Sequence, residues 1–200
     1  MVQRVRRVLI ASLIGLGFHT STWAAGLEAG RPLPELQFTN VQGERVDSNQ
    51  YADWVQIFTF ADQKSSTDLI NWMDEAGPKA MLRYPEARFA FLSFADVTAV
   101  PEMFRTLVAT AIAEVDKRSR KKMLESYQQR GVALDPNRAA FHLTPDWDGT
   151  WLNTFQIEDA HLFYCWLVYQ GRVIARYQGD SPDLQAQFLS DLDLLLSPVK

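Results

Sequence analysis

The sequence predicts one α/β domain in which a mixed central β-sheet is flanked by helices. Segments rich in β-branched and aromatic residues alternate with segments of helical apolar spacing, which is typical of a layered α/β sheet. Gln170-Gly171 separates two strand-like runs closely enough for an antiparallel pair at the end of the domain. No repeat, low-complexity stretch or linker divides residues 25–200, so we expect a single domain.

Strand-forming composition marks each β-element in turn. Residues 33–46 predict an N-terminal hairpin that turns at Gln42-Gly43. Later runs are rich in β-branched and aromatic side chains, and we expect three of them, at residues 54–60, 88–95 and 163–168, to lie together in the interior of one sheet. Strands are expected at residues 54–60, 88–95, 141–144, 161–169 and 172–177. Pro145 should end the third of them, because proline cannot donate to a β-ladder.

Helical apolar spacing marks four helices between or after these strands. They are expected at residues 66–82, 101–130, 151–155 and 182–196. At the start of the first, Ser65 and Asp68 resemble a capping box, and Gly77-Pro78 should interrupt the helix. The first half of the second helix has apolar residues with a period of about 3.6, which predicts a face packed on the core. That face consists of Phe104, Leu107, Val108, Ala111, Ile112 and Val115.

The order of these elements and several local sequences resemble the redoxin branch of the thioredoxin superfamily, of the peroxiredoxin and TlpA-like kind. Residues 55–61 resemble the strand that leads into the family's active-site loop. Residues 146–179 resemble the family's second half, with an Asp-Gly turn, a short helix, a strand and a Gly-Arg hairpin. The resemblance implies a thioredoxin-like layered sandwich over nearly all of residues 25–200, with an enlarged helical segment at 101–135.

The residues that carry the family's reaction are absent from this chain. Where the family has its reactive cysteines, residues 64–67 read Lys-Ser-Ser-Thr, and His161 or the next residue stands where the family has a cis-proline. The only cysteine is Cys165, in an apolar run that predicts a strand covered on both faces. A buried thiol of this kind behaves as a small hydrophobe, so we expect no catalytic residue of the redox type.

The favoured hypothesis is therefore a binding or adaptor protein without dithiol redox activity. Its former redox loop would contact a protein partner or a small anionic ligand, because a helix N-terminus offers N–H donors and Lys64 adds a positive charge. The candidate site consists of Asp62, Lys64, Ser65, Ser66, Thr67 and His161. A Ser-His-Asp hydrolase at these residues has no supporting sequence motif. The alternative hypothesis is a thiol-dependent oxidoreductase of redoxin type that works through Cys165.

A basic run in the second helix is a further candidate surface. It consists of Lys117, Arg118, Arg120, Lys121 and Lys122. A solvated helix face with ion pairs is the simpler interpretation, since acidic residues lie nearby. The functional interpretation is a docking patch for an acidic partner or for anionic headgroups.

Residues 146–150 read Asp-Trp-Asp-Gly-Thr, which matches the opening motif of haloacid-dehalogenase-like phosphatases and resembles a calcium loop. Only 50 residues follow the motif, too few for the rest of such a phosphatase, and the later calcium ligands are missing. An Asx-type turn that caps the next helix is the favoured interpretation. No paired His or Cys spacing supports zinc or copper, and we expect no metal and no other cofactor.

Residues 1–24 have the features of a cleavable signal peptide: three Arg, an apolar run of 11 residues and Thr-Trp-Ala at 22–24. The apolar run is shorter than the roughly 20 residues that span a bilayer. We therefore expect export, to the periplasm or beyond, and no membrane span in the mature chain. The whole chain has 20 basic and 24 acidic side chains, and the mature chain would have 17 and 24. Such an acidic protein is a poor candidate for binding nucleic acid.

Overall fold

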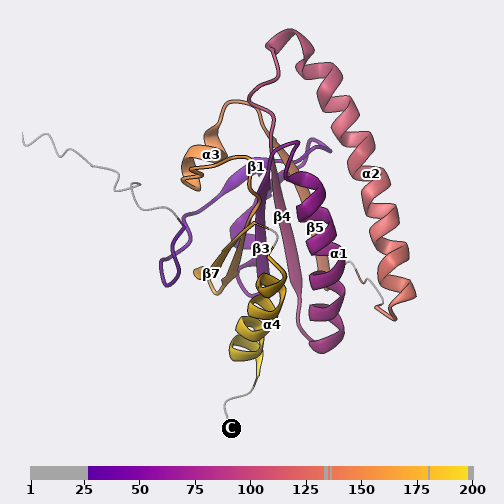
Figure 1. Ribbon diagram of the computed structural model, residues 1–200, viewed down its shortest axis with the longest axis vertical. Coiled ribbons are helices and arrows are strands. Elements are labelled where there is room, and N and C mark those ends of the chain that lie inside the picture. The colour runs from indigo at the N-terminus through magenta and orange to yellow at the C-terminus, as the bar shows by residue number, and fades with distance from the viewer. Residues whose placement is uncertain (1–26, 133–134, 136, 180, 198–200) are drawn as a thin grey trace, which may run out of the picture.

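The computed structural model describes residues 27–132, 135, 137–179 and 181–197, so the expected signal peptide lies outside the described residues (Figure 1). A five-stranded sheet has the order β5-β4-β3-β6-β7. Its strands are β3 (Val55–Ala61), β4 (Phe89–Asp96), β5 (Ala139–Asp146), β6 (Tyr164–Tyr169) and β7 (Arg172–Gln178). β3, β4 and β5 are parallel, whereas β6 is antiparallel to both β3 and β7. The predicted mixed sheet is confirmed.

Two apolar cores lie on opposite faces of this sheet. Alternating residues of β6 divide between them: Cys165 and Leu167 belong to one core, Tyr164 and Trp166 to the other. The first core is covered by α1 (Ser66–Arg83) and α4 (Pro182–Leu196). The second is covered by α3 (Thr150–Thr154) and by the hairpin of β1 (Gln37–Thr39) and β2 (Arg45–Asp47). Short 3-10 turns, η1 (Ser48–Tyr51) and η2 (Glu102–Phe104), precede β3 and α2 (Arg105–Gln129).

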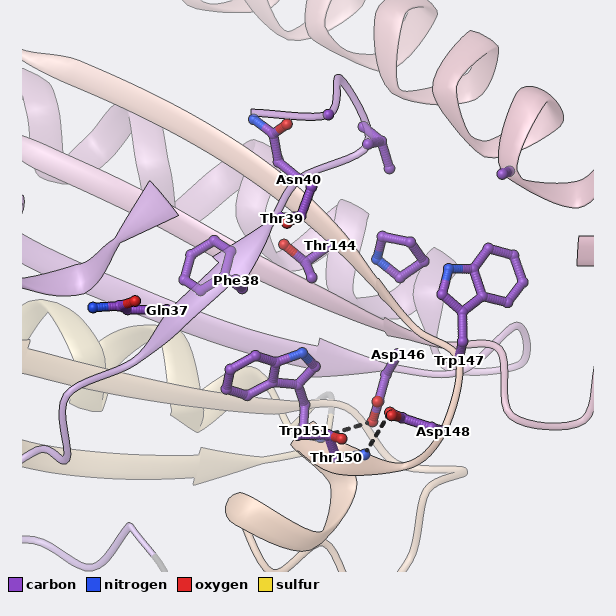
Figure 2. A pocket seen from close by; sticks show the side chains of 14 residues that line it. Gln37, Phe38, Thr39, Asn40, Thr144, Asp146, Trp147, Asp148, Thr150 and Trp151 are labelled. Atoms are coloured by element: carbon purple, nitrogen blue, oxygen red, sulfur yellow. Dashed lines mark hydrogen bonds between the residues drawn. The ribbon is translucent and has the colours of Figure 1, made fainter. Parts of the chain in front are cut away.

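The β1–β2 hairpin, α2 and α3 lie around the carboxyl end of β5 and leave a hollow between them (Figure 2). We name it the β5-end hollow; its walls include Phe38, Thr144, Asp146, Trp147 and Trp151. None of the described helices is long and apolar enough to cross a membrane.

Two predicted interruptions are wrong. α1 runs through Gly77-Pro78 without a break, and both residues are buried. Packing on the sheet holds this helix together although Pro78 has no N–H to donate. β5 extends through Pro145 to Asp146. Because β5 is an edge strand, the missing N–H of proline leaves the ladder to β4 intact.

The predicted core face of α2 is wrong for four of its six residues, whereas Val108 and Ile112 are half-buried. Phe104, Leu107 and Val115 are 46%, 69% and 50% exposed, and Ala111 is exposed as well. The physical reason is that other elements already cover both faces of the sheet, so α2 lies beside the edge strand β5 (Figure 1). α2 packs on the domain through an adjoining side, where Asp116 and Tyr127 are buried and which Val108 and Ile112 border as half-buried residues. The enlarged helical segment therefore presents an apolar stripe to solvent.

Candidate functional site

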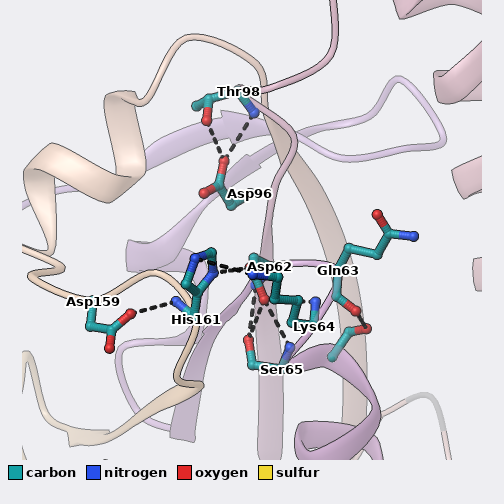
Figure 3. A network of polar contacts seen from close by, with 9 residues as sticks. Asp62, Gln63, Lys64, Ser65, Asp96, Thr98, Asp159 and His161 are labelled. Atoms are coloured by element: carbon teal, nitrogen blue, oxygen red, sulfur yellow. Dashed lines mark hydrogen bonds and ion pairs between the residues drawn. The ribbon is translucent and has the colours of Figure 1, made fainter.

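The candidate site lies at the end of the sheet where the central strand β3 terminates, α1 begins and the chain enters β6. Asp62 follows the last residue of β3, and Lys64 and Ser65 lead into α1. His161 comes from the segment before β6, which begins three residues later than the predicted strand. The structure brings these four residues together in one polar network (Figure 3).

The Asp62 carboxylate is the centre of the network. Its Oδ1 accepts hydrogen bonds from the backbone N–H of Lys64 (2.8 Å), the backbone N–H of Ser65 (2.8 Å) and the Ser65 hydroxyl (2.9 Å). Its Oδ2 lies 2.7 Å from Nδ1 of His161. The Ser65 hydroxyl accepts in turn from the Asp62 N–H (3.1 Å). Asp62 therefore closes the turn into α1, whereas Ser65 makes no cap bond to the helix. The predicted capping box of Ser65 and Asp68 is wrong.

These bonds set the charge state of Asp62. Burial by itself would raise the pKa of the carboxyl, but the Ser65 N–H, the His161 ring, the Ser65 hydroxyl and the Lys64 N–H together lower it below its ordinary value. An ionised Asp62 requires His161 Nδ1 to be the donor in their contact. The other ring nitrogen, Nε2, lies 3.4 Å from Nζ of Lys64 and can accept from this ammonium in the neutral form of the ring.

A hydrolytic triad does not form at this site. The Ser65 hydroxyl donates to Asp62 rather than to His161, and Ser65 is only 3% exposed. A nucleophilic serine needs its base within hydrogen-bond reach and an open path to substrate. Ser65 has neither, so its role is structural. Ser66 is likewise used locally, since its hydroxyl donates to the Gln63 carbonyl oxygen (3.0 Å).

The helix N-terminus already has an anion of its own. The N–H groups of Lys64 and Ser65 donate to the Asp62 carboxylate, and the Ser66 N–H donates to the Asp62 carbonyl oxygen (3.0 Å). The carboxylate therefore occupies the position in which an incoming anion would bind. What remains accessible is the side-chain surface: Lys64 and Thr67 are exposed, and the His161 side chain is 63% exposed.

Sequence reasoning missed the acidic side chains at the carboxyl ends of the three parallel strands. Asp96 ends β4 and Asp146 ends β5, in register with each other, and Asp62 follows β3. Asp159 also orients His161, because its Oδ1 accepts from the His161 N–H (2.9 Å; Figure 3). The available signal was the Asp that comes at the end of each parallel strand. No group of three or more His, Cys, Asp or Glu converges on a possible metal position within the described parts of the chain.

Comparisons with known proteins show the fold. No family model matches the sequence, and no curated protein matches it. A solved structure assigned as thiol:disulfide interchange protein DsbE from Chlorobium tepidum matches with TM-score 0.52 and 15% identity, covering 84% of this chain and 99% of that one. Peroxidoxin BcpB from Mycobacterium tuberculosis matches with TM-score 0.52 and 14% identity, over 86% and 99%.

A structure assigned as a protein disulfide isomerase from Bacteroides thetaiotaomicron matches with TM-score 0.52 and 12% identity, over 86% of this chain and 92% of that one. The chain has the thioredoxin-like fold. The network around Asp62 lies in the loop that the sequence resemblance predicts to correspond to the reactive loop of the redoxins. The residues there include no cysteine.

The single thiol of the chain lies within the sheet, outside that loop. Cys165 lies on β6 between Thr59 of β3 and Tyr177 of β7, and it is 0% exposed. Burial raises the pKa of the Cys165 thiol far above its ordinary value. The predicted burial of Cys165 on a strand covered from both faces is confirmed.

The Asp146 motif caps a helix, as predicted. Asp146 Oδ2 accepts from the backbone N–H groups of Trp151 (3.1 Å) and Leu152 (2.8 Å), and Asp148 Oδ1 accepts from that of Thr150 (3.1 Å). These bonds satisfy three of the backbone N–H donors in the first turn of α3. The motif thus has a structural role.

The basic run lies on α2, an element separate from the loop. Lys117, Arg118, Lys121 and Lys122 are exposed. Arg120 turns inward instead, where its Nε is 2.7 Å from Oδ2 of the buried Asp116. The predicted patch therefore has four accessible cations rather than five.

Proposed function

We propose that this protein is an exported thioredoxin-fold binding or adaptor protein that works without dithiol exchange. One observation carries the proposal: the loop that resembles the redoxins' reactive loop holds the Asp62–His161 network and no cysteine, and the one thiol in the chain is fully buried in the sheet. Dithiol exchange needs an accessible thiolate and a second cysteine. The chain supplies neither.

A protein partner fits the loop better than a small anion does. The backbone donors at the start of α1 are taken by Asp62, and aspartates surround the loop. Among these aspartates, the side chains of Lys64 and His161 are exposed to solvent. Such a mixed surface suits a partner that meets it with both donors and acceptors.

The solvent-facing side of α2 supports the binding class independently. Met103, Phe104 and Leu107 are 82%, 46% and 69% exposed, and the exposed cations of the basic run follow them along the helix. Large apolar side chains gathered at one place on a surface mark an interaction site. We propose that Met103, Phe104 and Leu107, together with the exposed cations of the basic run, form a second contact surface, which we name the α2 stripe. It would contact a partner with apolar and acidic groups.

Export rests on the signal-peptide features of residues 1–24. Mass spectrometry of the protein from its native host tests it. We expect an N-terminus near Ala25. An intact N-terminus at Met1 or Val2 would refute export.

Capture from periplasmic extract tests the loop. The bait is the mature protein, and the variant combines Lys64→Glu with His161→Ala. We expect the variant to fold normally, since neither side chain belongs to an apolar core, and to lose the bands that the wild type captures. Lys79→Glu, an equal charge change on exposed α1 residue 79, is the control and should retain them. Equal capture by all three proteins would exclude the loop and leave the α2 stripe as the candidate.

The alternative, a thiol-dependent oxidoreductase that uses Cys165, makes a different prediction. It requires disulfide or peroxide reduction that Cys165→Ser abolishes. Because the thiol is 0% exposed, such a reaction would need the sheet to open around β6.

A further inference from the structure

The β5-end hollow has the dimensions of a ligand site. Its volume is about 550 Å³, and it lies between the β1–β2 hairpin, α2, the end of β5 and the start of α3 (Figure 2). Cavities of roughly 300–1,000 Å³ commonly hold small ligands. In open α/β sheets, ligands often bind beyond the carboxyl ends of the parallel strands, which is where this hollow lies.

Two buried oxygens of its wall residues have no hydrogen-bond partner in the part of the chain that the structure describes. These are Oγ1 of Thr144 and Oδ1 of Asp146, on residues that are 3% and 1% exposed. The two residues are separated by one position on β5, so their side chains lie on the same face of the strand. The other carboxylate oxygen of Asp146 is fully used by the N–H groups of Trp151 and Leu152. A buried acceptor without a donor is unfavourable, so both oxygens favour a ligand that donates.

The charge around Asp146 favours a cation. Burial raises the pKa of the Asp146 carboxyl, and the N–H groups of Leu152 and Trp151 lower it. The negative charges of Asp148 and Asp96 nearby raise it further. Within the described residues, Asp146 has no Lys or Arg within ion-pair distance. The nearby Arg105 instead donates to the Trp147 carbonyl oxygen (3.1 Å) and lies over the Trp147 ring.

Aromatic side chains form the apolar part of the wall. Phe38 and Trp151 hold each other in an edge-to-face contact with ring centroids 5.9 Å apart, and Trp151 also packs on Phe94 at 4.9 Å. Trp147 lines the opposite side (Figure 2). Aromatic faces attract organic cations and pack against their hydrocarbon parts.

We propose that the β5-end hollow binds a small organic cation. Its ammonium or amidinium group lies against Asp146 and Thr144, and its apolar part packs against Phe38, Trp147 and Trp151. Because Asp146 Oδ1 and Thr144 Oγ1 each expose less than 1 Å² without ligand, the wall side chains shift on binding so that both oxygens accept N–H bonds. This site is separate from the loop around Asp62, and it requires no partner protein.

Calorimetric titration with phenethylamine and with its neutral analogue 2-phenylethanol tests the proposal. We expect one amine to bind per chain and the alcohol to bind at least about tenfold more weakly, because it lacks the charge-assisted bond. Asp146→Asn preserves an acceptor for the helix N–H groups and removes the charge, so amine affinity should fall about tenfold or more. Asp183→Asn, an equal change at an exposed residue of α4, should leave the affinity unchanged.

Thr144→Val provides a second variant if Asp146→Asn does not fold. It matches threonine in shape and removes the hydroxyl, and we expect amine affinity to fall about threefold to tenfold. Equal affinity for amine and alcohol would overturn the proposal, as would unchanged amine affinity in the Asp146 or Thr144 variant. Absence of saturable amine binding up to about 10 mM would overturn it as well.

Discussion

Gly77→Ala should destabilise this protein although glycine in a helix is usually unfavourable. Gly77 lies inside α1, where Ala would normally gain about 1 kcal/mol. A Cβ at this position would lie 2.1 Å from the hydroxyl oxygen of Tyr127 on α2 and 3.2 Å from its Cζ. Tyr127 is 0% exposed, so its ring has little room to move. Gly77 therefore permits the close approach of α1 and α2.

Overpacking of a buried contact costs about 1–3 kcal/mol, and a contact this short belongs near the upper end. After the helical gain of Ala is subtracted, we expect a net loss of about 2 kcal/mol, or a fall in Tm of about 4–8 °C. Tyr127→Phe should be nearly neutral alone, because the hydroxyl that it removes has no hydrogen-bond partner among the described residues.

A double-mutant cycle separates this clash from other effects of Gly77→Ala. In the Tyr127→Phe background, the clash with the hydroxyl is gone, so we expect Gly77→Ala to be nearly neutral. Urea unfolding followed by circular dichroism measures all four proteins. A coupling free energy of at least about 1 kcal/mol is expected between the two positions. Stabilisation by Gly77→Ala with Tyr127 present, or additive effects across the cycle, would refute the close packing of α1 on α2.

Three further predictions concern charge and burial. The lowered pKa of Asp62 means that its ionised form stabilises the fold above about pH 4, so Asp62→Asn should cost about 1–2 kcal/mol near pH 7 and progressively less as the pH falls through the folded pKa. The raised pKa of Asp146 has the opposite effect on the pH dependence of stability, because burial favours the protonated carboxyl. The free energy of unfolding of the wild type should fall relative to that of Asp146→Asn as the pH rises from about 3 to about 7. Parallel pH profiles for these two variants, measured by thermal unfolding, would contradict the assignments. Leu107→Ala should change the free energy of unfolding by less than about 0.5 kcal/mol, since Leu107 is 69% exposed, whereas a core leucine would cost about 2–5 kcal/mol.

Local composition predicted most of the sheet because its strands are buried on both faces. The runs that became β3, β4 and β6 are apolar on both sides, and they are adjacent in the sheet, as expected. The closing helix was predicted with its observed bounds, Pro182–Leu196. Its apolar side packs on the face of the sheet that α1 also covers.

Apolar periodicity did not predict the packing of α2 correctly. An apolar stripe shows that one side of a helix is hydrophobic, but it does not show whether another element of the domain packs against that side. The stripe of Leu107 and Val115 looks like a core face in sequence, yet both faces of the sheet are already covered. Position within the sheet, which the sequence does not state, also explains Pro145: an edge strand tolerates a proline that an inner strand would not.

The candidate loop was located by its resemblance to the redoxins, but its internal contacts were not foreseen. The sequence places Ser65 three residues before Asp68, which suggests a capping box. The observed cap comes instead from Asp62, through the turn that precedes the helix. His161 reaches the same carboxylate from a position 99 residues away, and no local pattern reports such a contact.

Reduction of insulin disulfides in the presence of glutathione tests the central claim most directly. The proposed function holds that this protein does not exchange thiols, because the loop at Asp62 has no cysteine and Cys165 is 0% exposed. We predict that the wild type and Cys165→Ser both react at the rate of glutathione alone. A wild-type rate clearly above that background, lost in Cys165→Ser, would contradict the account and establish Cys165 as a reactive thiol.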